Sequence, residues 1–480
     1  MSEKYLKYKH KYLSLKNKYE LINKDYQLLI PNDNSLSQIQ TINKDSQLLI
    51  PPSISTMITT PTQISIWNNP ICKLTKNSDI ITNNPFIFNH SVTGEFKITD
   101  QKLSGRCWLF ATLNMVRFLA CDLWKTEMDT KELEFSQSYL FFWDKYERYH
   151  RYLNYFLDIN SKPDSDLKQH LFTFICNKPL SDGGQWDMVK EVIKKYGIVP
   201  KTIYPDSYHA GNSEKMNEIL TEMLKQDWII LSNKTQELVD KLIPEMMNKV
   251  FNTLVSFLGK PPTTFDWEFI YEKNTKVWKY MTPLKLLEKT GFVPDDWVSI
   301  VNDPRKENGY NKYYQIEYIG NVKNQHVGWL NVEMKRLKEM AVESINSNNS
   351  VWVGCDVGAH RDTESGIHAP NVNKYHELLE LQNTMNKEDR IRYYSSVPSH
   401  AMVITAYHLD NNIVKRWKVE NSWGDKKGFN GYLLFTDEWF DEYVFQIVVH
   451  KKHLNPQEKN ALTQEAIKVK PWDAISVLAS

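Results

Sequence analysis

The sequence is poor in cysteine and in long apolar runs. It has five cysteines in 480 residues, and they form neither a C-x-x-C pair nor a regular framework, which argues against a disulfide-stapled domain and favours a reducing compartment. No stretch approaches the roughly 20 apolar residues of a membrane span. The lysine-rich start lacks the apolar segment of a signal peptide. We therefore expect a cytoplasmic protein that is neither secreted nor inserted in a membrane.

Net charge and cofactor motifs are lacking too. Basic and acidic residues nearly cancel, with a formal net charge of +1, so the molecule as a whole has no electrostatic reason to seek nucleic acid or an acidic membrane. The chain has no G-x-G-x-x-G sequence and no phosphate-binding P-loop. The run from His376 to Glu380 begins like the zinc motif H-E-x-x-H but ends in glutamate. We expect no cofactor and no catalytic metal.

Residues 1–65 differ from the rest of the chain, because they are rich in Lys, Asn, Ser and Thr. A segment beginning at Ile22 returns almost unchanged at Ile42, and two such short copies indicate a local duplication because they cannot stack into a core. Apolar and aromatic residues between Tyr5 and Ile22 are spaced three and four apart, as on one stripe of a helix. A docking or coiled-coil helix and a partly ordered basic tail both fit this pattern.

The remainder is globular in character, since 41% hydrophobic residues overall allow a large buried core. Residues 107–124 are apolar almost all round, as in a helix buried at a domain centre. Short β-type runs follow at 351–354, 401–405, 416–419, 432–435 and 444–449. Helices first and strands last predict an α+β protein with two lobes and a cleft between them.

This pattern predicts five parts of the chain. They are a basic low-complexity extension (1–65), a helical lobe with the candidate nucleophile (66–210), a helical insertion (211–345), a β-rich, barrel-like lobe (346–455) and a C-terminal tail (456–480). The insertion contains aromatic residues but no recognisable reactive cluster. The chemistry is therefore expected in the two lobes that flank it.

Cys107 stands where a glycine-containing loop enters the apolar helix. The unpaired N–H groups and the positive dipole end of a helix favour an anion, so we expect the thiol pKa to fall from about 8.5 towards the range of about 3.5–7.5. A thiolate is the competent nucleophile. The ordinary alternative is a cysteine that acts only as a small buried hydrophobe, and the flanking Gly105 and Trp108 argue against it.

A base has to come from far along the chain. His400 opens a β-type run, and Asn421 follows 21 residues later, just before Trp423. A lone histidine is most often structural, but together these residues complete a cysteine, histidine, asparagine order. In that arrangement the imidazole takes the thiol proton, the asparagine amide accepts from the other ring N–H and fixes the tautomer, and Trp423 shields that hydrogen bond from water.

Gly-x-Cys-Trp is the core of the papain signature, and the chain resembles papain-type cysteine peptidases elsewhere too. Gln101, six residues before Cys107, holds the position from which that family supplies an amide to the oxyanion hole. Asp182-Gly183-Gly184 resembles the family stretch whose backbone pairs with an extended substrate. The family's disulfide between these two segments is replaced here by Ser104 and Ser181, which fits a reducing compartment.

The chain resembles the bleomycin hydrolase, or aminopeptidase C, group more closely, over about residues 66–480. Cys107 and His400 are 293 residues apart, about twice the papain separation of about 130–150, so an insertion must lie between them. The segments similar to the group are Gly105–Phe110, Lys195–Pro200, Phe265–Glu268, Val353–Gly358 and Thr436–Val444. The resemblance implies a papain-like fold, a helical insertion and hydrolysis of peptide substrates.

The resemblance also implies an assembly and a specificity. Members form a homohexameric ring with active sites facing an inner chamber, and a C-terminal tail lies in each cleft. The terminal carboxylate there meets the free amine of the substrate, which restricts the enzyme to aminopeptidase action. Ala479 and Ser480 are then substrate-binding residues, and we expect Trp423 to take part in substrate binding as well. Residues 474–477 depart from the usual family tail, so the exopeptidase preference follows less directly than the nucleophile does.

Two alternatives stand beside this interpretation. If the tail does not block the cleft, the chain is a papain-like endopeptidase or a broad peptide hydrolase. It is otherwise an inactive ring protein associated with nucleic acid, because some relatives bind DNA and the basic residues within 4–18 are suited to weak nucleic-acid binding. The Lys/Tyr-rich leader is similar to those of many giant DNA virus proteins. A viral source would allow packaging in the virion.

Overall fold

A computed structural model of the chain describes residues 60–94, 96–125, 128–177, 179–382 and 384–479. The predicted N-terminal amphipathic helix and the duplicated segment lie outside the described residues. The chain divides into one unit up to Pro70 and another from Ile71 onward. The first unit contains helix α3 (Pro61–Asn68), which begins where the side chain of Thr60 accepts a hydrogen bond from the backbone N–H of Gln63. Everything below concerns the second unit.

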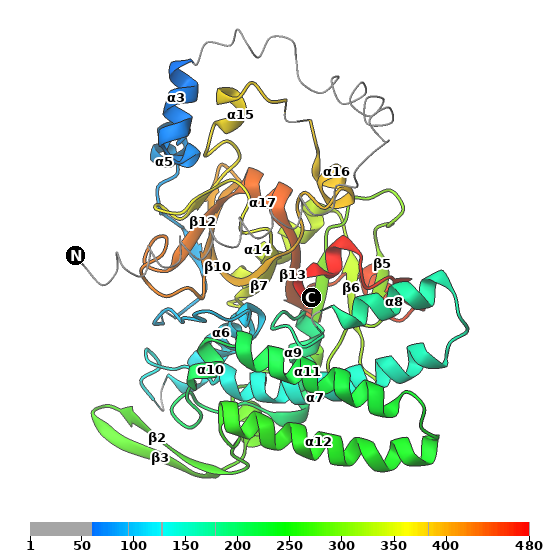
Figure 1. The fold of residues 1–480 in the computed structure, drawn as a ribbon. Helices are drawn as coiled ribbons and strands as arrows, with labels where there is room; N and C mark the ends of the chain where they lie inside the picture. The colour runs from blue at the N-terminus through cyan, green and yellow to red at the C-terminus, as the bar shows by residue number, and fades with distance from the viewer. Residues whose placement is uncertain (1–59, 95, 126–127, 178, 383, 480) are drawn as a thin grey trace, which may run out of the picture. The chain divides into compact units, whose positions relative to one another are not determined.

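Helices dominate the second unit as far as residue 258 (Figure 1). They are α4 (Ile71–Leu74), α5 (Ser78–Asn83), α6 (Cys107–Trp124), α7 (Gln137–Ser161), α8 (Asp166–Cys176), α9 (Trp186–Tyr196), α10 (Tyr208–Gly211), α11 (Glu214–Leu231) and α12 (Gln236–Leu258). Helix α6 covers the predicted apolar run from end to end, and nearly all its side chains are buried. The prediction of a central buried helix is confirmed.

The strands form one large sheet and a separate hairpin. They are β1 (His90–Ser91), β2 (Phe265–Tyr271), β3 (Asn274–Met281), β4 (Trp297–Val301), β5 (Lys312–Ile316), β6 (Val327–Asn331), β7 (Val351–Cys355), β8 (Arg361–Asp362), β9 (Ile367–His368), β10 (His400–Asp410), β11 (Ile413–Glu420), β12 (Tyr432–Thr436), β13 (Val444–His450) and β14 (Ile467–Val469). The sheet order is β14-β5-β6-β4-β13-β7-β10-β11-β12-β9-β8, with β1 on β10. All five predicted β-type runs are confirmed as strands β7, β10, β11, β12 and β13.

The prediction that residues 211–345 are mostly helical is wrong for much of its second half. Strands β2 and β3 form the hairpin, and β4, β5 and β6 belong to the large sheet. Every residue of β4 and of β6 is buried. A short run buried on both faces has no alternation of apolar and polar residues, so its sequence cannot be distinguished from that of a buried helix turn. Helices α11 and α12 occupy the first half, as predicted.

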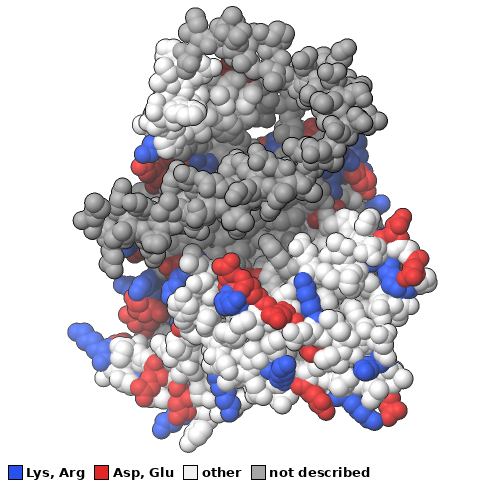
Figure 2. All heavy atoms as spheres, in the orientation of Figure 1, with Lys and Arg blue, Asp and Glu red and all other residues white. Residues whose placement is uncertain are grey.

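Short helices connect and cover the strands after residue 281. They are α13 (Pro283–Lys289), η2 (Pro294–Asp296), α14 (Met334–Asn346), α15 (Tyr375–Leu378), α16 (Lys387–Arg392), α17 (Asp437–Tyr443), η3 (Lys451–His453), α18 (Pro456–Ala461) and η4 (Ala474–Ala479). Among the described residues, no helix combines the length and apolarity needed to cross a membrane. On the face shown in Figure 2, basic and acidic side chains of the described residues are interspersed, with neither sign gathered into a continuous patch.

The start of α6 packs directly against the middle of the sheet. The indole N–H of Trp352 in β7 donates to the carbonyl oxygen of Trp108 at 3.4 Å, and both tryptophans are fully buried. Strand β7 pairs with β10 in a register that sets Cys355 opposite His400. Cys107 and His400, which lie almost three hundred residues apart in the sequence, are thereby held on neighbouring elements.

Candidate active site

His400 is held in one orientation by Asn421. The two ends of the contact are Nε2 of the imidazole and Oδ1 of the amide, 2.9 Å apart. Oδ1 also accepts the backbone N–H of Ser422 at 2.8 Å. Because a backbone N–H can only donate, that second bond identifies Oδ1 as the acceptor, and Nε2 must then carry the imidazole proton. The neutral imidazole therefore has its lone pair on Nδ1, as a base for a thiol requires.

The Cys107 thiol lies at the first turn of α6, against the beginning of β10. Burial raises the pKa of the Cys107 thiol to about 11, although the backbone N–H groups of Ala401, Trp108 and Cys107 itself lower it. Ala401 directly follows His400, the first residue of β10, so the sulfur lies against the start of the strand that carries the imidazole. The predicted fall of the thiol pKa is wrong for the enzyme without substrate, because desolvation outweighs the helix terminus.

Burial also governs the pKa of His400. It lowers the pKa of His400 to about 4, while the hydrogen bond to Asn421 raises it and the Arg361 charge lowers it further. The Trp423 ring lies over the imidazole with 4.7 Å between ring centres. The His400–Asn421 hydrogen bond is itself buried, and its shielding by Trp423 stays a prediction. Burial therefore favours the uncharged form of each group.

Gln101 lies in the loop that leads to Cys107. Its Nε2 donates to the carbonyl oxygen of Ser104 at 2.7 Å, and its Oε1 accepts from Ser422 Oγ at 2.8 Å. The Gln101 N–H also donates to the Ser422 carbonyl oxygen at 2.9 Å. These bonds join the nucleophile loop to the residue that follows Asn421. An amide has two N–H donors, and among the described contacts Nε2 uses one of them.

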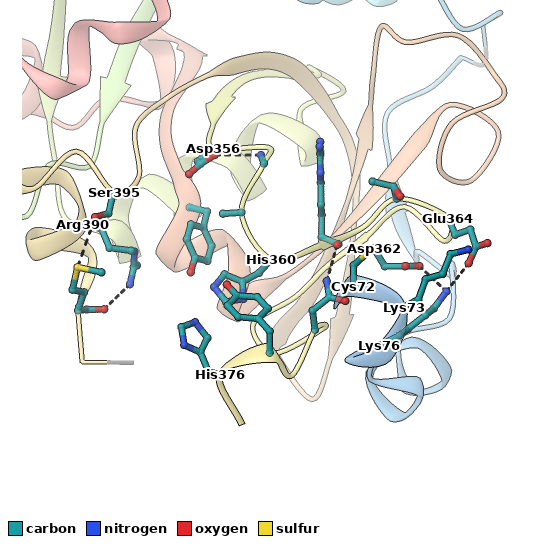
Figure 3. A pocket seen from close by; sticks show the side chains of 18 residues that line it. Cys72, Lys73, Lys76, Asp356, His360, Asp362, Glu364, His376, Arg390 and Ser395 are labelled. Atoms are coloured by element: carbon teal, nitrogen blue, oxygen red, sulfur yellow. Dashed lines mark hydrogen bonds and ion pairs between the residues drawn. The ribbon is translucent and has the colours of Figure 1, made fainter. Parts of the chain in front are cut away.

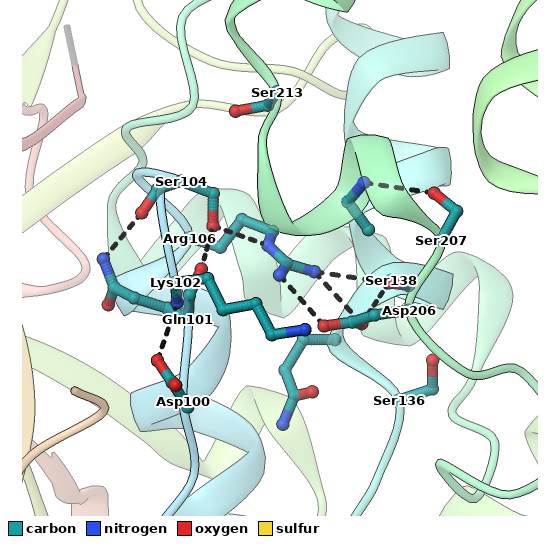
Figure 4. A network of polar contacts seen from close by, with 12 residues as sticks. Asp100, Gln101, Lys102, Ser104, Arg106, Ser136, Ser138, Asp206, Ser207 and Ser213 are labelled. Atoms are coloured by element: carbon teal, nitrogen blue, oxygen red, sulfur yellow. Dashed lines mark hydrogen bonds and ion pairs between the residues drawn. The ribbon is translucent and has the colours of Figure 1, made fainter. Parts of the chain in front are cut away.

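Arg106, directly before Cys107, is completely buried. Figure 4 shows its guanidinium between the nucleophile loop and Asp206. It donates to Ser104 Oγ at 2.9 Å and to Asp206 Oδ2 at 3.2 Å, and Ser138 Oγ accepts another bond at 3.2 Å. A short side chain such as serine at this position could not reach these partners.

Asp182, predicted to bind substrate, directs its carboxylate into the protein. It accepts the Gly105 N–H at 3.0 Å and the Asn217 amide at 2.7 Å, pairs with the Lys145 ammonium at 2.9 Å, and also accepts from Ser213 Oγ. Burial by itself raises the pKa of Asp182, but Lys145 and these hydrogen bonds hold it well below its usual range. The side chain therefore fixes the loop two residues ahead of Cys107.

The structure gives a second reason for glycine at position 184. A Cβ on Gly184 would come within 2.3 Å of the Trp108 ring, and the Trp108 indole N–H donates to the carbonyl oxygen of Asp182 at 2.7 Å. Any side chain here would push the segment away from α6. Gly183 offers its carbonyl oxygen to Arg148 at 2.7 Å. Gly184 is therefore needed for close packing on α6, and the approach of a substrate backbone to this segment stays a prediction.

The C-terminal segment reaches both walls of this region. Gln185 Nε2, next to Gly184, donates to the carbonyl oxygen of Ile475 at 3.4 Å. On the sheet side, Leu478 comes within 3.4 Å of a Cβ built on Gly354 of β7. Of the two predicted tail residues, Ser480 and the side chain of Ala479 lie outside the described residues.

Sequence reasoning missed the buried ion pairs behind the site. Lys145–Asp182, Arg106–Asp206 and Arg117–Glu420 each include, or adjoin in sequence, a predicted site residue. In all three pairs both side chains are 10% exposed or less. The available signal was the presence of charged residues inside otherwise apolar segments, such as Arg117 within α6. Their partners, far away in sequence, could not be identified from it.

Two hollows adjoin the site. One, of about 1100 Å³, runs along the nucleophile loop and α11, and its lining includes Leu103, Gly105, Asp182 and Glu218. The other, of about 780 Å³, contains Arg361, whose guanidinium carbon is 5.9 Å from the centre of the Trp423 ring.

Figure 3 shows His360 and His376 side by side in the second hollow, and their rings are stacked with 6.3 Å between centres. His376 opened the incomplete zinc-like motif. Within the described parts of the chain, no three His, Cys, Asp or Glu side chains are grouped to hold a metal ion. The five cysteines are free thiols.

Residues 56–476 match the model of the Peptidase C1-like family. The chain belongs to this family. Aminopeptidase C of Listeria monocytogenes is 37% identical over 425 residues, which cover 87% of this chain and 94% of that protein. Bleomycin hydrolase of Homo sapiens is 38% identical over 411 residues, covering 82% and 89%. The crystal structure of PepW from Lactobacillus rhamnosis has a TM-score of 0.82 at 31% identity, covering 93% of this chain and 99% of that one.

These matches confirm the resemblance to the aminopeptidase C and bleomycin hydrolase group. They also confirm the α+β, two-lobed papain-like fold. This member of the Peptidase C1-like family is a cysteine peptidase.

Proposed function

We propose that the chain is a cysteine aminopeptidase that hydrolyses the peptide bond next to a free amino terminus. Cys107 is the nucleophile, His400 the base and Asn421 the residue that orients the imidazole. One observation carries the proposal: Asn421 leaves the lone pair of the imidazole on Nδ1, while the thiol lies against the start of the same strand. Relatives named aminopeptidase C and bleomycin hydrolase support this type of reaction.

In the proposed mechanism, Nδ1 of His400 removes the thiol proton as Sγ of Cys107 attacks the carbonyl carbon of the peptide bond. The oxyanion accepts from the Cys107 N–H and from the second N–H of the Gln101 amide. Nδ1–H then protonates the leaving amine, the C–N bond breaks, and a thioester remains. Water, deprotonated by the same nitrogen, hydrolyses the thioester and restores the thiol.

Burial determines when the thiolate forms. With the pKa of Cys107 raised to about 11 and that of His400 lowered to about 4, a lone charge on either group is unfavourable. Proton transfer creates both charges together, and their attraction offsets part of the desolvation cost. We therefore propose that the thiolate–imidazolium pair arises during attack on the substrate and is a minor species before it.

The tail is the proposed source of amino-terminal specificity. The contacts of Ile475 with Gln185 and of Leu478 with Gly354 support a tail that occupies the non-primed side of the cleft. Peptide could then extend only a short way past Cys107 before meeting the chain terminus, whose carboxylate suits a substrate ammonium group. An endopeptidase, in which the tail does not restrict binding, is the competing proposal.

The homohexameric ring and the cytoplasmic location remain predictions from the resemblance and from the low cysteine content. Weak nucleic-acid binding also remains a prediction, because the basic residues within 4–18 lie outside the described residues. Binding that weakens steeply with salt and disappears on removal of residues 1–65 would support it.

Product analysis tests the proposed function. Intact enzyme and a chain lacking residues 477–480 are incubated with one peptide in two forms, with a free and with an acetylated amino terminus, and the products are identified by mass spectrometry. We expect the intact enzyme to release single amino-terminal residues from the free form only. We expect the shortened enzyme to cleave both forms. Equal cleavage of both forms by the intact enzyme would support the endopeptidase instead.

A further inference from the structure

A largely buried ion pair joins the residue directly before η4 to the body of the enzyme. Asp473 Oδ1 accepts from Arg305 Nη2 at 2.9 Å. The two side chains are 16% and 11% exposed, so solvent screens their attraction much less than at an open surface. Asp473 is also the last residue before the six-residue turn Ala474–Ala479, the red segment at the end of the chain in Figure 1.

Arg305 is already fixed before it meets the tail. Its Nε and Nη2 both bond the carboxylate of Asp303, with Nη2 at 2.7 Å from Oδ2. Asp303 is buried, and its N–H and carbonyl oxygen are both bonded to the side chain of Asn331 in β6. A guanidinium held in this way loses little conformational freedom when it binds a second carboxylate. The loop after β4 thus holds Arg305 in position to bind Asp473.

Asp473 in turn orients the residues that follow it. Its Oδ1 accepts the Ile475 N–H at 2.9 Å, and its carbonyl oxygen accepts the Ser476 N–H at 2.9 Å. One carboxylate therefore joins the fixed Arg305 to the first turn of the segment that reaches Gln185 and Gly354. The hydroxyl of Tyr394 adds a bond to the carbonyl oxygen of Trp472.

We propose that the Arg305–Asp473 ion pair is the latch that sets the position of the tail in the cleft. Arg305 and Asp473 are positioning residues, since neither touches the reacting atoms. This proposal rests on the proposed restriction of specificity by the tail. It adds the residues that control the position of the tail. When the latch is weakened, a larger fraction of molecules has the tail out of the cleft, and blocked peptides are cleaved in proportion to that fraction.

Asp473→Asn tests the ion pair separately from the turn, because an asparagine oxygen can still accept the Ile475 N–H. Replacing a charge-assisted bond by a neutral one weakens it to roughly half. We expect the ratio of kcat/KM for acetylated over free peptide to rise about tenfold, which is about 1.4 kcal/mol. Asp473→Ala should raise it further. Asp473→Glu, which keeps the carboxylate, should stay closer to the wild-type ratio than either.

Lys470→Gln is the matched control. Lys470 lies three residues earlier in the same tail and pairs with Glu317 at 2.7 Å, but at 46% and 31% exposure. Its loss should leave the ratio unchanged. Release of C-terminal residues by an added carboxypeptidase, followed by mass spectrometry, gives a readout that does not depend on activity. It should be faster for Asp473→Asn than for wild type and Lys470→Gln.

The outcomes separate the latch from the tail restriction itself. If removal of residues 477–480 raises the ratio while Asp473→Asn and Asp473→Ala change neither the ratio nor the digestion rate, the latch is wrong and the tail restriction stands. If neither truncation nor substitution changes the ratio, the tail restriction is wrong and the latch with it. A ratio that rises equally in Lys470→Gln would show a general loosening of the tail and would also overturn the latch.

Discussion

Replacing Asp182 with asparagine measures how far the order of the active site depends on one buried ion pair. The change keeps the size of the side chain and removes its charge. Lys145, whose side chain is 0% exposed, would then keep only its bonds to the carbonyl oxygens of Leu180 and Ser181, at 2.6 and 2.8 Å. Asparagine has one accepting oxygen for four donors, so it must also turn its NH₂ group towards some of them.

The magnitude follows from the separation and burial of the pair. At 2.9 Å, two unit charges attract by about 6 kcal/mol at an effective dielectric constant of about 20, and desolvation of both ions cancels much of this in the intact pair. Removal of one partner leaves the other charge buried alone, at a cost of about 3–5 kcal/mol. We therefore expect Asp182→Asn to lower the free energy of unfolding by about that amount.

Urea unfolding followed by tryptophan fluorescence measures the loss, and a double-mutant cycle assigns it. Lys145→Met combined with Asp182→Asn should be less destabilised than the sum of the single changes, because no uncompensated charge remains. Lys241→Met is the control, since its pair with Glu237 is 66% and 80% exposed and its loss should cost only about 0.3–0.5 kcal/mol. Additive single effects, or an Asp182→Asn enzyme as stable as the control, would refute the reasoning.

Three further outcomes test the proposed chemistry. Cys107→Ala should abolish hydrolysis and thiol alkylation at this site with little change in unfolding, because only one buried sulfur is lost; retained activity in a purified variant would exclude Cys107 as nucleophile. His400→Ala should reduce kcat/KM nearly as far and Asn421→Ala by less, since the second variant keeps the base and loses only its orientation; the reverse order would contradict these roles. Because burial lowers the pKa of His400 to about 4, the neutral base is present above that pH, so kcat/KM should fall on the acid side near pH 4; an acid limb at about 6.5 in enzyme shown by fluorescence to remain folded would contradict the burial.

The lowered pKa of His400 also makes the stability of the folded state depend on pH in a definite direction. A histidine whose pKa falls from 6.5 to about 4 on folding stabilises the folded state fully above pH 6.5. The contribution is lost as the pH falls from 6.5 to about 4, up to about 3 kcal/mol for this residue. His368, also buried with a pKa lowered to about 4, acts in the same direction. Acid inactivation should therefore be checked against unfolding at each pH.

The start of α6 could be predicted because the residues that indicate it are adjacent in the sequence. Gly105 precedes an uninterrupted apolar run, and the helix begins at Cys107. Strands such as β10 and β13 contain several β-branched residues and were predicted for the same reason. Strands β4 and β6 were not, because burial on both faces removes alternation. The family resemblance, which rests on ordered motifs, identified the candidate site without any knowledge of the fold.

Properties that depend on distant partners could not be predicted. Arg117 and Glu420 are 303 residues apart and meet only in the folded chain, and nothing near Asp182 in sequence indicates Lys145. The thiol pKa was predicted in the wrong direction for a similar reason. The helix terminus is visible in the sequence around Cys107, whereas the depth of burial depends on β10.

The contact between Trp108 and Trp352 has a consequence for how ligands enter. A tryptophan buries about 150–250 Å², worth about 4–6 kcal/mol, and separating α6 from β7 would expose part of that surface on each ring. Hinge-like opening at this contact is therefore costly, so we expect α6 and β7 to keep their spacing when a ligand binds. Rigid inhibitors should then lose less affinity here than they would in a site whose walls move apart.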